Sequence, residues 1–335
     1  MTPDEELDRA ARAARAGDIV ALELVLREAP DVLKSRDAEG NTLLGLACKA
    51  ATGDVALPPV AGTPEQHAVV DLLLAAGADP SAAADNGWAP LHTAAMTGHV
   101  DLARRLLAAG AARAGQLLGA RGGSPLALAL FYGQARVAEV LAQPPLPDNL
   151  RTAAALNRSL DRFVEGAALT RQASEGTDFY RPLAAFPVWE RTNQRQELLD
   201  EALSWAARND ACAAMAALVA LGANVNANAY RGTALLWAVY ADRHSAASWL
   251  LDNGADPDLR HDFGGQGHGV QAVAMHLAAQ YSCLRCLGLL LERGADTTIK
   301  DAAYAATPLG WAEHHGASAA AALLRDRSSG RPTPS

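Results

Sequence analysis

One stretch limits the possible folds of this chain more than any other: DNGWAPLHTAAMTGHVDLARRLLAAGAA, residues 85–112. Pro90 predicts the first turn of a helix, because its fixed φ suits that position and its missing N–H would have no intrahelical partner there. Gly98 and Gly110 stand where the apolar pattern stops, so we expect a positive φ at both, in a turn and at a helix C-cap. Neither short helix can bury its apolar face alone, and the pattern therefore requires stacked copies.

Copies of these elements recur, interleaved in one order, along most of the chain. Further helix openings are NTLLGLA (41–47), SPLALAL (124–130), GTALLWA (232–238), VAMHLAA (273–279) and ATPLGWA (306–312). Further glycine stops are AAGAD, ALGAN, DNGAD and ERGAD, which end at Asp79, Asn224, Asp256 and Asp296. This repeat resembles that of the ankyrin family, with a period of about 33 residues. The resemblance implies an all-α ankyrin-repeat solenoid of eight or nine helix-turn-helix units with finger loops, interrupted by an irregular insertion.

Composition agrees with a solenoid and excludes some partners. A chain of 335 residues exceeds an ordinary single core, whereas a solenoid adds its core unit by unit. The net charge of −8 and the lack of a basic stripe argue against nucleic acid. The N-terminus is acidic, and the sequence has no long apolar run, so we predict no membrane partner. Because the four cysteines are too scattered for a disulfide framework, we predict a cytoplasmic protein. Abundant alanine and arginine beside very few lysines suggest a bacterial source.

The pattern predicts four parts along the chain. Residues 1–147 form an N-terminal array, whose capping unit breaks at Gly17 and whose second unit carries a loop insertion at 51–63. Residues 148–195 hold a degenerate helix pair (149–164) and an irregular, aromatic-rich insertion (165–195). Residues 196–327 form a C-terminal array, in which Asp210 replaces the usual turn glycine, and 328–335 form a flexible tail. The insertion is either a packed finger or a recognition loop, and the sequence leaves both open.

Two groups of residues invite a chemical role. Cys283 and Cys286 form a CxxC, but they lie inside a predicted second helix without a second ligand pair. We therefore expect Cys286 to be a small core residue rather than part of a metal or redox site. The loop HDFGGQGHG (261–269) brings histidines near His276, yet a glycine-rich loop loses much entropy when it is ordered around a metal. His276 matches the family's structural histidine. No catalytic motif is recognisable, so we predict no enzyme activity, no metal and no cofactor.

The resemblance does imply a binding surface. Partner proteins of the family contact the finger tips and the exposed side of the first helices, which stack into a concave face. Carried over unit by unit, the partner-binding candidates are Trp88, Met96, Phe131, Tyr132, Tyr230, Arg231, Tyr240, Tyr281, His314 and His315. Tyr240, Tyr281 and the histidine pair are expected to point toward solvent. Three tryptophans share one helix position, either as a binding ladder or as packing between repeats: Trp205, Trp237 and Trp311.

The predicted function is therefore a non-catalytic scaffold, a monomer that binds a partner protein on its concave face. Two alternatives stay open. One is a small-ligand or enzymatic role centred on the 165–195 insertion, and the other is a structural accessory subunit of a larger complex.

Overall fold

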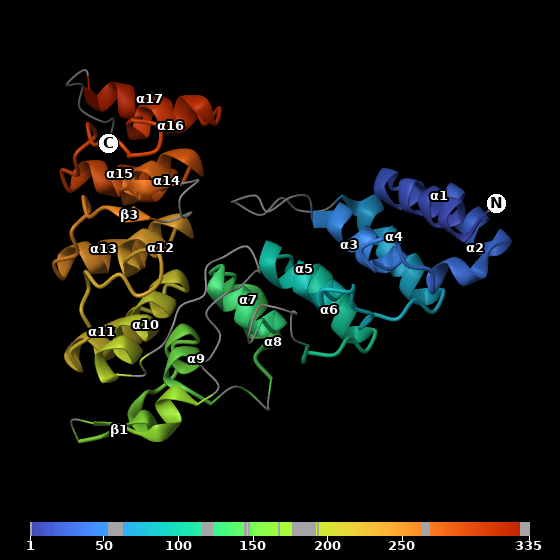
Figure 1. Cartoon of the computed structure of the whole chain (residues 1–335), viewed down its shortest axis with the longest axis horizontal. Helices are drawn as coiled ribbons and strands as arrows, with labels where there is room; N and C mark the ends of the chain where they lie inside the picture. Colours follow the sequence, from blue (N-terminus) through green and yellow to red (C-terminus); the bar gives the residue numbers. More distant parts are fainter. Residues whose placement is uncertain are drawn as a thin grey trace. The chain divides into compact units, whose positions relative to one another are not determined.

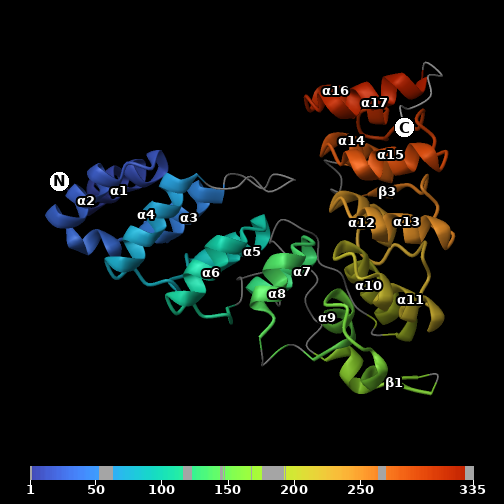
Figure 2. The same ribbon diagram turned by 180° about the vertical axis from the view of Figure 1, so that it is seen from behind.

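The computed structural model describes residues 2–52, 63–115, 123–143, 146, 148–166, 168–175, 192, 194–262 and 269–328. These residues form two compact units, the first ending at Leu146 and the second comprising the described residues from Asp148 onward. Each unit is a stack of short antiparallel helix pairs (Figures 1 and 2).

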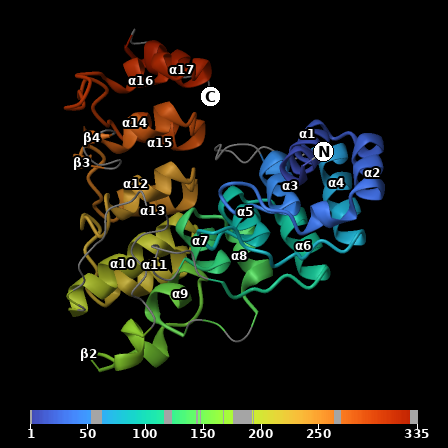
Figure 3. The same ribbon diagram turned by 45° about the vertical axis from the view of Figure 1, so that its right-hand side comes forward.

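The first unit contains four helix pairs. They are α1 (Pro3–Ala16) with α2 (Ile19–Glu28), α3 (Leu43–Thr52) with α4 (Pro64–Ala75), α5 (Pro90–Thr97) with α6 (Val100–Ala108), and α7 (Pro125–Phe131) with α8 (Ala135–Leu141). A 3-10 turn, η1 (Pro30–Leu33), follows the first pair. The first helices α1, α3, α5 and α7 pack on one another in succession, as Figure 3 shows. The apolar face of each pair is thus buried against its neighbour.

The second unit begins with the single helix α9 (Leu150–Ala155) and continues with four pairs. The pairs are α10 (Arg195–Arg208) with α11 (Cys212–Ala220), α12 (Ala234–Tyr240) with α13 (His244–Asp252), α14 (Ala274–Gln280) with α15 (Leu284–Glu292), and α16 (Pro308–His314) with α17 (Ser318–Ser328). Two short antiparallel hairpins project from the stack: β1 (Val164–Glu165) with β2 (Ala168–Leu169), and β3 (His261–Asp262) with β4 (Val270–Ala272). The described residues therefore hold eight helix pairs and α9.

The local signals read from the sequence are confirmed. Pro90 is the first residue of α5, and Gly98 and Gly110 have φ values of 78° and 92°. Gly17 separates α1 from α2 at a φ of 70°. Asp210 has a φ of 58°, which an aspartate tolerates better than most side chains. Each of these turns therefore has a residue suited to the left-handed region.

The segment 149–164 differs from the predicted helix pair. Its first helix is α9, but the second is replaced by a 3-10 turn, η2 (Asp161–Phe163), which the turn η3 (Arg171–Ser174) contacts. Ser159 Oγ bonds both the backbone N–H and a carboxylate oxygen of Asp161, and such local bonds compete with helix formation. Phe163 packs into the core there with none of its surface exposed, beside the buried Leu160 and Ala173. The predicted insertions at 51–63 and 165–195 lie largely outside the described residues.

Side chains of the turns also connect successive repeats of the second unit. A turn residue at positive φ accepts a hydrogen bond from a backbone N–H in the first turn of the next repeat's second helix. The three pairs are Asn157 Oδ1 with Ala214 N (3.0 Å), Asp210 Oδ1 with Ala246 N (2.7 Å) and Asp242 Oδ1 with Cys286 N (3.3 Å). Helix N-termini that lack a cap of their own are thus capped from the preceding repeat.

Across the described part of the chain, every helix is too short or too polar to cross a membrane.

Candidate partner-binding surface

In the first unit, the predicted site residues fall into an exposed pair and a buried pair. Trp88 is partly exposed, and its indole is fixed by a 2.8 Å hydrogen bond from Nε1 to Thr93 Oγ1. Met96, at the end of α5, is also partly exposed, and its carbonyl accepts from Gln134 Nε2 at 3.3 Å. Phe131 and Tyr132 pack edge to face, 5.3 Å apart, with only 3% and 7% of their surface exposed. The last two side chains thus belong mostly to the core.

At the finger before α12, Tyr230 and Arg231 lie differently. Tyr230 is 6% exposed, and its carbonyl accepts a hydrogen bond from Trp237 Nε1 at 2.9 Å. Arg231 is partly exposed and has a φ of 55°. Of these two predicted contact residues, Arg231 is accessible to solvent and Tyr230 is buried.

Tyr240 and Tyr281 contact each other, but the prediction that both rings point toward solvent is wrong for Tyr240. Tyr240 is 7% exposed, because its ring lies between Trp237, 5.5 Å away, and Tyr281, 5.1 Å away. Both contacts are edge to face. Tyr281 is partly exposed, and burial, followed by the charge of Cys283, raises the pKa of its hydroxyl. Tyr281 is therefore the surface residue of this cluster, and Tyr240 supports it.

The three tryptophans at the shared helix position are buried, which confirms the packing interpretation over the binding ladder. Trp205, Trp237 and Trp311 are 5%, 1% and 4% exposed. Between the first two lies Arg208, whose guanidinium carbon is 3.5 Å from the Trp237 ring centroid and 6.0 Å from that of Trp205. A row of contacting rings and guanidinium groups thus runs from α10 across α12 to Tyr281 after α14.

Sequence analysis missed the other end of this row. Arg151 on α9 and Glu201 on α10 form an ion pair of 2.8 Å, and they are 5% and 2% exposed. The Arg151 guanidinium also lies 4.5 Å above the Trp205 ring. The two residues are fifty positions apart, and the segment around Arg151 carries no repeat motif from which a position could be carried over. A buried pair of this kind has no local signal in the sequence.

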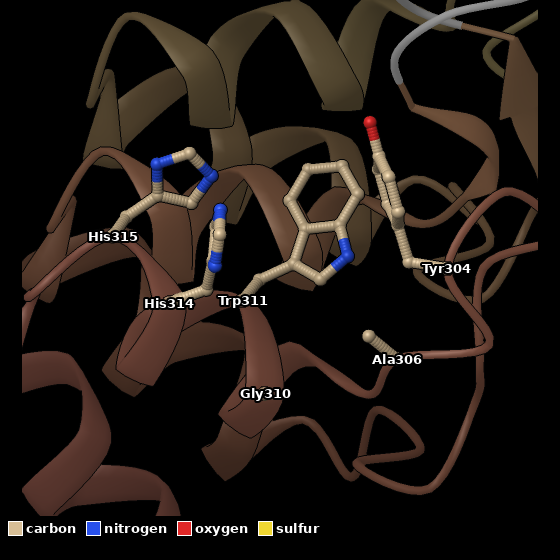
Figure 4. A pocket seen from close by; sticks show the side chains of 6 residues that line it. All are labelled: Tyr304, Ala306, Gly310, Trp311, His314 and His315. Carbon is tan, nitrogen blue, oxygen red and sulfur yellow. The ribbon is translucent and has the colours of Figure 1, made fainter.

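The last repeat holds a cleft of about 270 Å³ lined by Tyr304, Ala306, Gly310, Trp311, His314 and His315. In Figure 4 the indole of Trp311 stands between the Tyr304 ring and the two imidazoles. Trp311 Nε1 donates to Asp301 Oδ2 at 3.0 Å, and the rings of His314 and His315 meet edge to face at 5.0 Å. Tyr304 is 62% exposed, and both histidines are exposed. The predicted pair His314 and His315 thus borders a concave surface.

The chemically suggestive residues have structural positions. Cys283 and Cys286 are buried free thiols, and burial raises the pKa of Cys283 to about 12. His276 is fully buried: its Nδ1 accepts from Val273 N, so Nε2 carries the hydrogen that it donates to the Ala306 carbonyl at 3.1 Å. Burial also lowers the pKa of His276, which favours the neutral ring. Within the described ranges, no three His, Cys, Asp or Glu side chains gather closely enough to hold a metal ion.

This architecture defines a helical repeat protein. Helix pairs are stacked and joined by extended fingers, and polar and aromatic side chains lie at the ends of the first helices. The family model for "Ankyrin repeats (3 copies)" matches residues 61–150 and 176–261, and the model for "Ankyrin repeat" matches residues 272–302. These matches span more than half of the chain, which therefore belongs to the ankyrin-repeat family. Ankyrin repeats are generally protein–protein interaction modules and typically non-enzymatic. A search of curated proteins found no match.

Proposed function

We propose that the chain is a non-catalytic scaffold that binds a partner protein on the concave face of its ankyrin array. The binding surface is formed by the ends of the first helices and the adjoining fingers. Arg231, Tyr281, His314 and His315 are its accessible residues in the second unit.

The observation that carries the proposal is the row of rings and guanidinium groups in successive repeats of the second unit. The partly exposed Tyr281 packs on the buried Tyr240, which in turn contacts Trp237, and Trp237 stacks on Arg208. Tyrosine, tryptophan and arginine are the residue types that dominate binding energy at protein interfaces. A side chain that is already fixed loses little entropy on binding, so this support favours affinity.

Among the described residues of this face, the charged groups are arranged for packing rather than for catalysis. Its buried ionic groups are engaged in pairs or stacks, as Arg151 is with Glu201 and Trp205. The family's typical role as an interaction module agrees with recognition by shape and contact rather than with a chemical reaction.

The test compares two substitutions that add the same charge at partly or largely exposed positions. Tyr281→Glu changes the proposed face, and Leu284→Glu, at the 38% exposed first residue of α15, is the matched control outside it. Each variant and the natural chain serve as bait for affinity capture, with recovered proteins quantified by mass spectrometry. We expect Tyr281→Glu to lower recovery of a specific partner at least about tenfold, as for an interface hot spot, and Leu284→Glu to leave it unchanged.

Both variants must retain the helical circular dichroism of the natural chain. Equal recovery with Tyr281→Glu and Leu284→Glu, in correctly folded proteins, would show that the partner binds elsewhere.

A further inference from the structure

The cleft beside α16 lies at a helix position that a histidine side chain occupies in two interior repeats. Gly310, which lines the cleft, is the third residue of α16, as Gly45 is of α3, His92 of α5 and His276 of α14. The two histidines show what lies at this position when another repeat follows. They therefore indicate which chemistry the cleft of the last repeat accommodates.

In both interior examples, the occupant is an extended segment that leads into a proline. His276 Nε2 contacts the carbonyl of Ala306, which precedes Thr307 (φ −79°, ψ 168°) and Pro308. His92 Nε2 contacts the carbonyl of Gly123, which precedes Ser124 (φ −73°, ψ 159°) and Pro125. These dihedral angles lie near the polyproline II region. Inside the array, a small residue followed by Ser-Pro or Thr-Pro thus packs beside the first helix.

In the last repeat, Gly310 has only a hydrogen atom where His92 and His276 carry an imidazole ring. A Cβ at Gly310 would lie 3.5 Å from Ala306 Cβ and 3.9 Å from Thr307 Oγ1, in ordinary van der Waals contact. The cleft of about 270 Å³ therefore has room for one ring and its adjoining backbone. That volume lies just below the range of about 300–1,000 Å³ that is usual for pockets holding drug-sized molecules.

The lining determines what the occupant must offer. Trp311 and Tyr304 supply ring faces, and the imidazoles of His314 and His315 can donate hydrogen bonds. None of the described residues that line the cleft is a carboxylate. The nearby Asp301 already accepts bonds from the backbone N–H groups of residues 303, 304 and 306 and from Trp311 Nε1. The cleft is thus suited to carbonyl acceptors and an apolar ring rather than to a cation.

An acidic ligand fits less well. The chain as a whole carries a net charge of −8, which repels an anion. A neutral, proline-containing strand has solvated carbonyls and a preformed extended backbone, and aromatic-lined grooves recognise such strands.

We propose that the cleft of Tyr304, Trp311, His314 and His315 binds an extended segment of the partner protein that contains Ser-Pro or Thr-Pro. The proline ring packs against the Trp311 and Tyr304 rings, and the histidines donate to carbonyls of the segment. This inference rests on the proposed function, since it assigns one element of the partner to one end of the array.

The probe is a neutral, end-capped Ala-Pro-Thr-Pro-Ala-Pro peptide labelled with fluorescein, titrated with the full chain at pH 7 by fluorescence anisotropy. The decisive variant is Gly310→Leu, because it fills the cleft with a side chain that the equivalent position of α12 carries as Leu236. The matched control is Gly288→Leu in α15, where a Cβ would meet nothing within 4 Å. Both changes raise helix propensity, so both proteins are expected to fold.

We expect saturable binding to the natural chain and to Gly288→Leu, and at least about tenfold weaker binding to Gly310→Leu, as for loss of an interface hot spot. A peptide with alanine at every proline should also bind at least about tenfold more weakly. Absence of binding, or equal binding to both glycine variants, would overturn the proposal. Tighter binding of a polyglutamate or trimethyllysine peptide would replace the proposed ligand chemistry. Binding that arises only after removal of residues 329–335 would make the chain's own tail the occupant and overturn the assignment to a partner.

The outcomes separate this inference from the proposed function. If partner capture depends on Tyr281 but not on Gly310, the peptide-binding proposal is wrong and the proposed scaffold function stands. If peptide binding depends on Gly310 but Tyr281→Glu does not affect partner capture, the proposal that the partner binds on the concave face is wrong instead.

Discussion

The turn residue Asp210 offers the sharpest test of how the repeats are joined. It stands at a φ of 58° between α10 and α11, and its Oδ1 accepts a 2.7 Å hydrogen bond from Ala246 N in the next repeat. Asp210→Ala removes the acceptor and leaves a residue with a Cβ, and no hydrogen-bonding side chain, in the left-handed region.

The two losses can be separated by a series of substitutions at this position. Loss of a helix N-cap costs about 1 kcal/mol, and an ordinary side chain in the left-handed region costs roughly 1–2 kcal/mol. Asp210→Ala should therefore destabilise the second unit by about 2–3 kcal/mol. Asp210→Gly loses the cap but no longer strains the backbone, so about 1 kcal/mol is expected. Asp210→Asn keeps an oxygen acceptor and tolerates positive φ, so its effect should stay within about 0.5 kcal/mol.

Urea unfolding followed by circular dichroism gives the order of the variants. Because long repeat arrays do not always unfold in one step, hydrogen exchange of the Ala246 amide is the more direct measurement. That amide should exchange faster in the alanine and glycine variants than in the asparagine variant. Ser282→Gly is the control, since Ser282 also has a positive φ of 54°, and glycine there should cause no large loss.

Two results would refute the reasoning. Equal destabilisation by alanine and glycine would show that backbone strain contributes nothing at Asp210. An asparagine variant as unstable as the alanine variant would show that the bond to Ala246 N contributes nothing.

Further predictions concern the core and the last finger. Hydrogen bonds outweigh burial and lower the pKa of the Asp301 carboxyl group. The ionised carboxylate should therefore stabilise the fold fully above the ordinary aspartate pKa, and this stabilisation should disappear as the pH falls through the lower pKa of the folded state. Asp301→Ala should remove this pH dependence from acid unfolding, which can be followed by the fluorescence of Trp311. Trp237→Ala should cost about 3–5 kcal/mol in urea unfolding, because it leaves a cavity beside a buried arginine. Burial lowers the pKa of His92 to about 4, so the natural chain should lose stability between about pH 6.5 and pH 4, while His92→Gln should lose less over that interval in pH-dependent urea unfolding. Of the four free cysteines only Cys212 is not fully buried, so a thiol reagent should label it first in the native protein, as mass spectrometry can show.

The helices of this protein were predictable because their signals are local. Pro90 and Gly98 fix the beginning and the end of α5 through backbone geometry that depends on no distant residue. The same reasoning anticipated that Asp210 would take a positive φ. Stacking of the pairs followed as well, since a thin amphipathic pair must bury its face on a neighbour.

The candidate site was less predictable, because exposure depends on which side chains the next repeat supplies. Tyr240 occupies a helix position open to solvent in a single repeat, yet Tyr281 from the following repeat covers its ring. Conversely, Gly310 has no side chain at the helix position where α5 and α14 carry His92 and His276, and it lines a cleft. The binding role of the ten candidate residues remains a prediction to be tested.

The sequence by itself determined the repeat unit, since proline, glycine and apolar spacing act within a few residues of the backbone. Only the tertiary structure decided how the units are joined: the carboxylate of Asp210 caps a helix thirty-six residues later, and Arg151 pairs with Glu201 fifty residues later. These contacts join side chains whose positions depend on the packing of whole repeats, and such packing leaves no periodic signal in the chain.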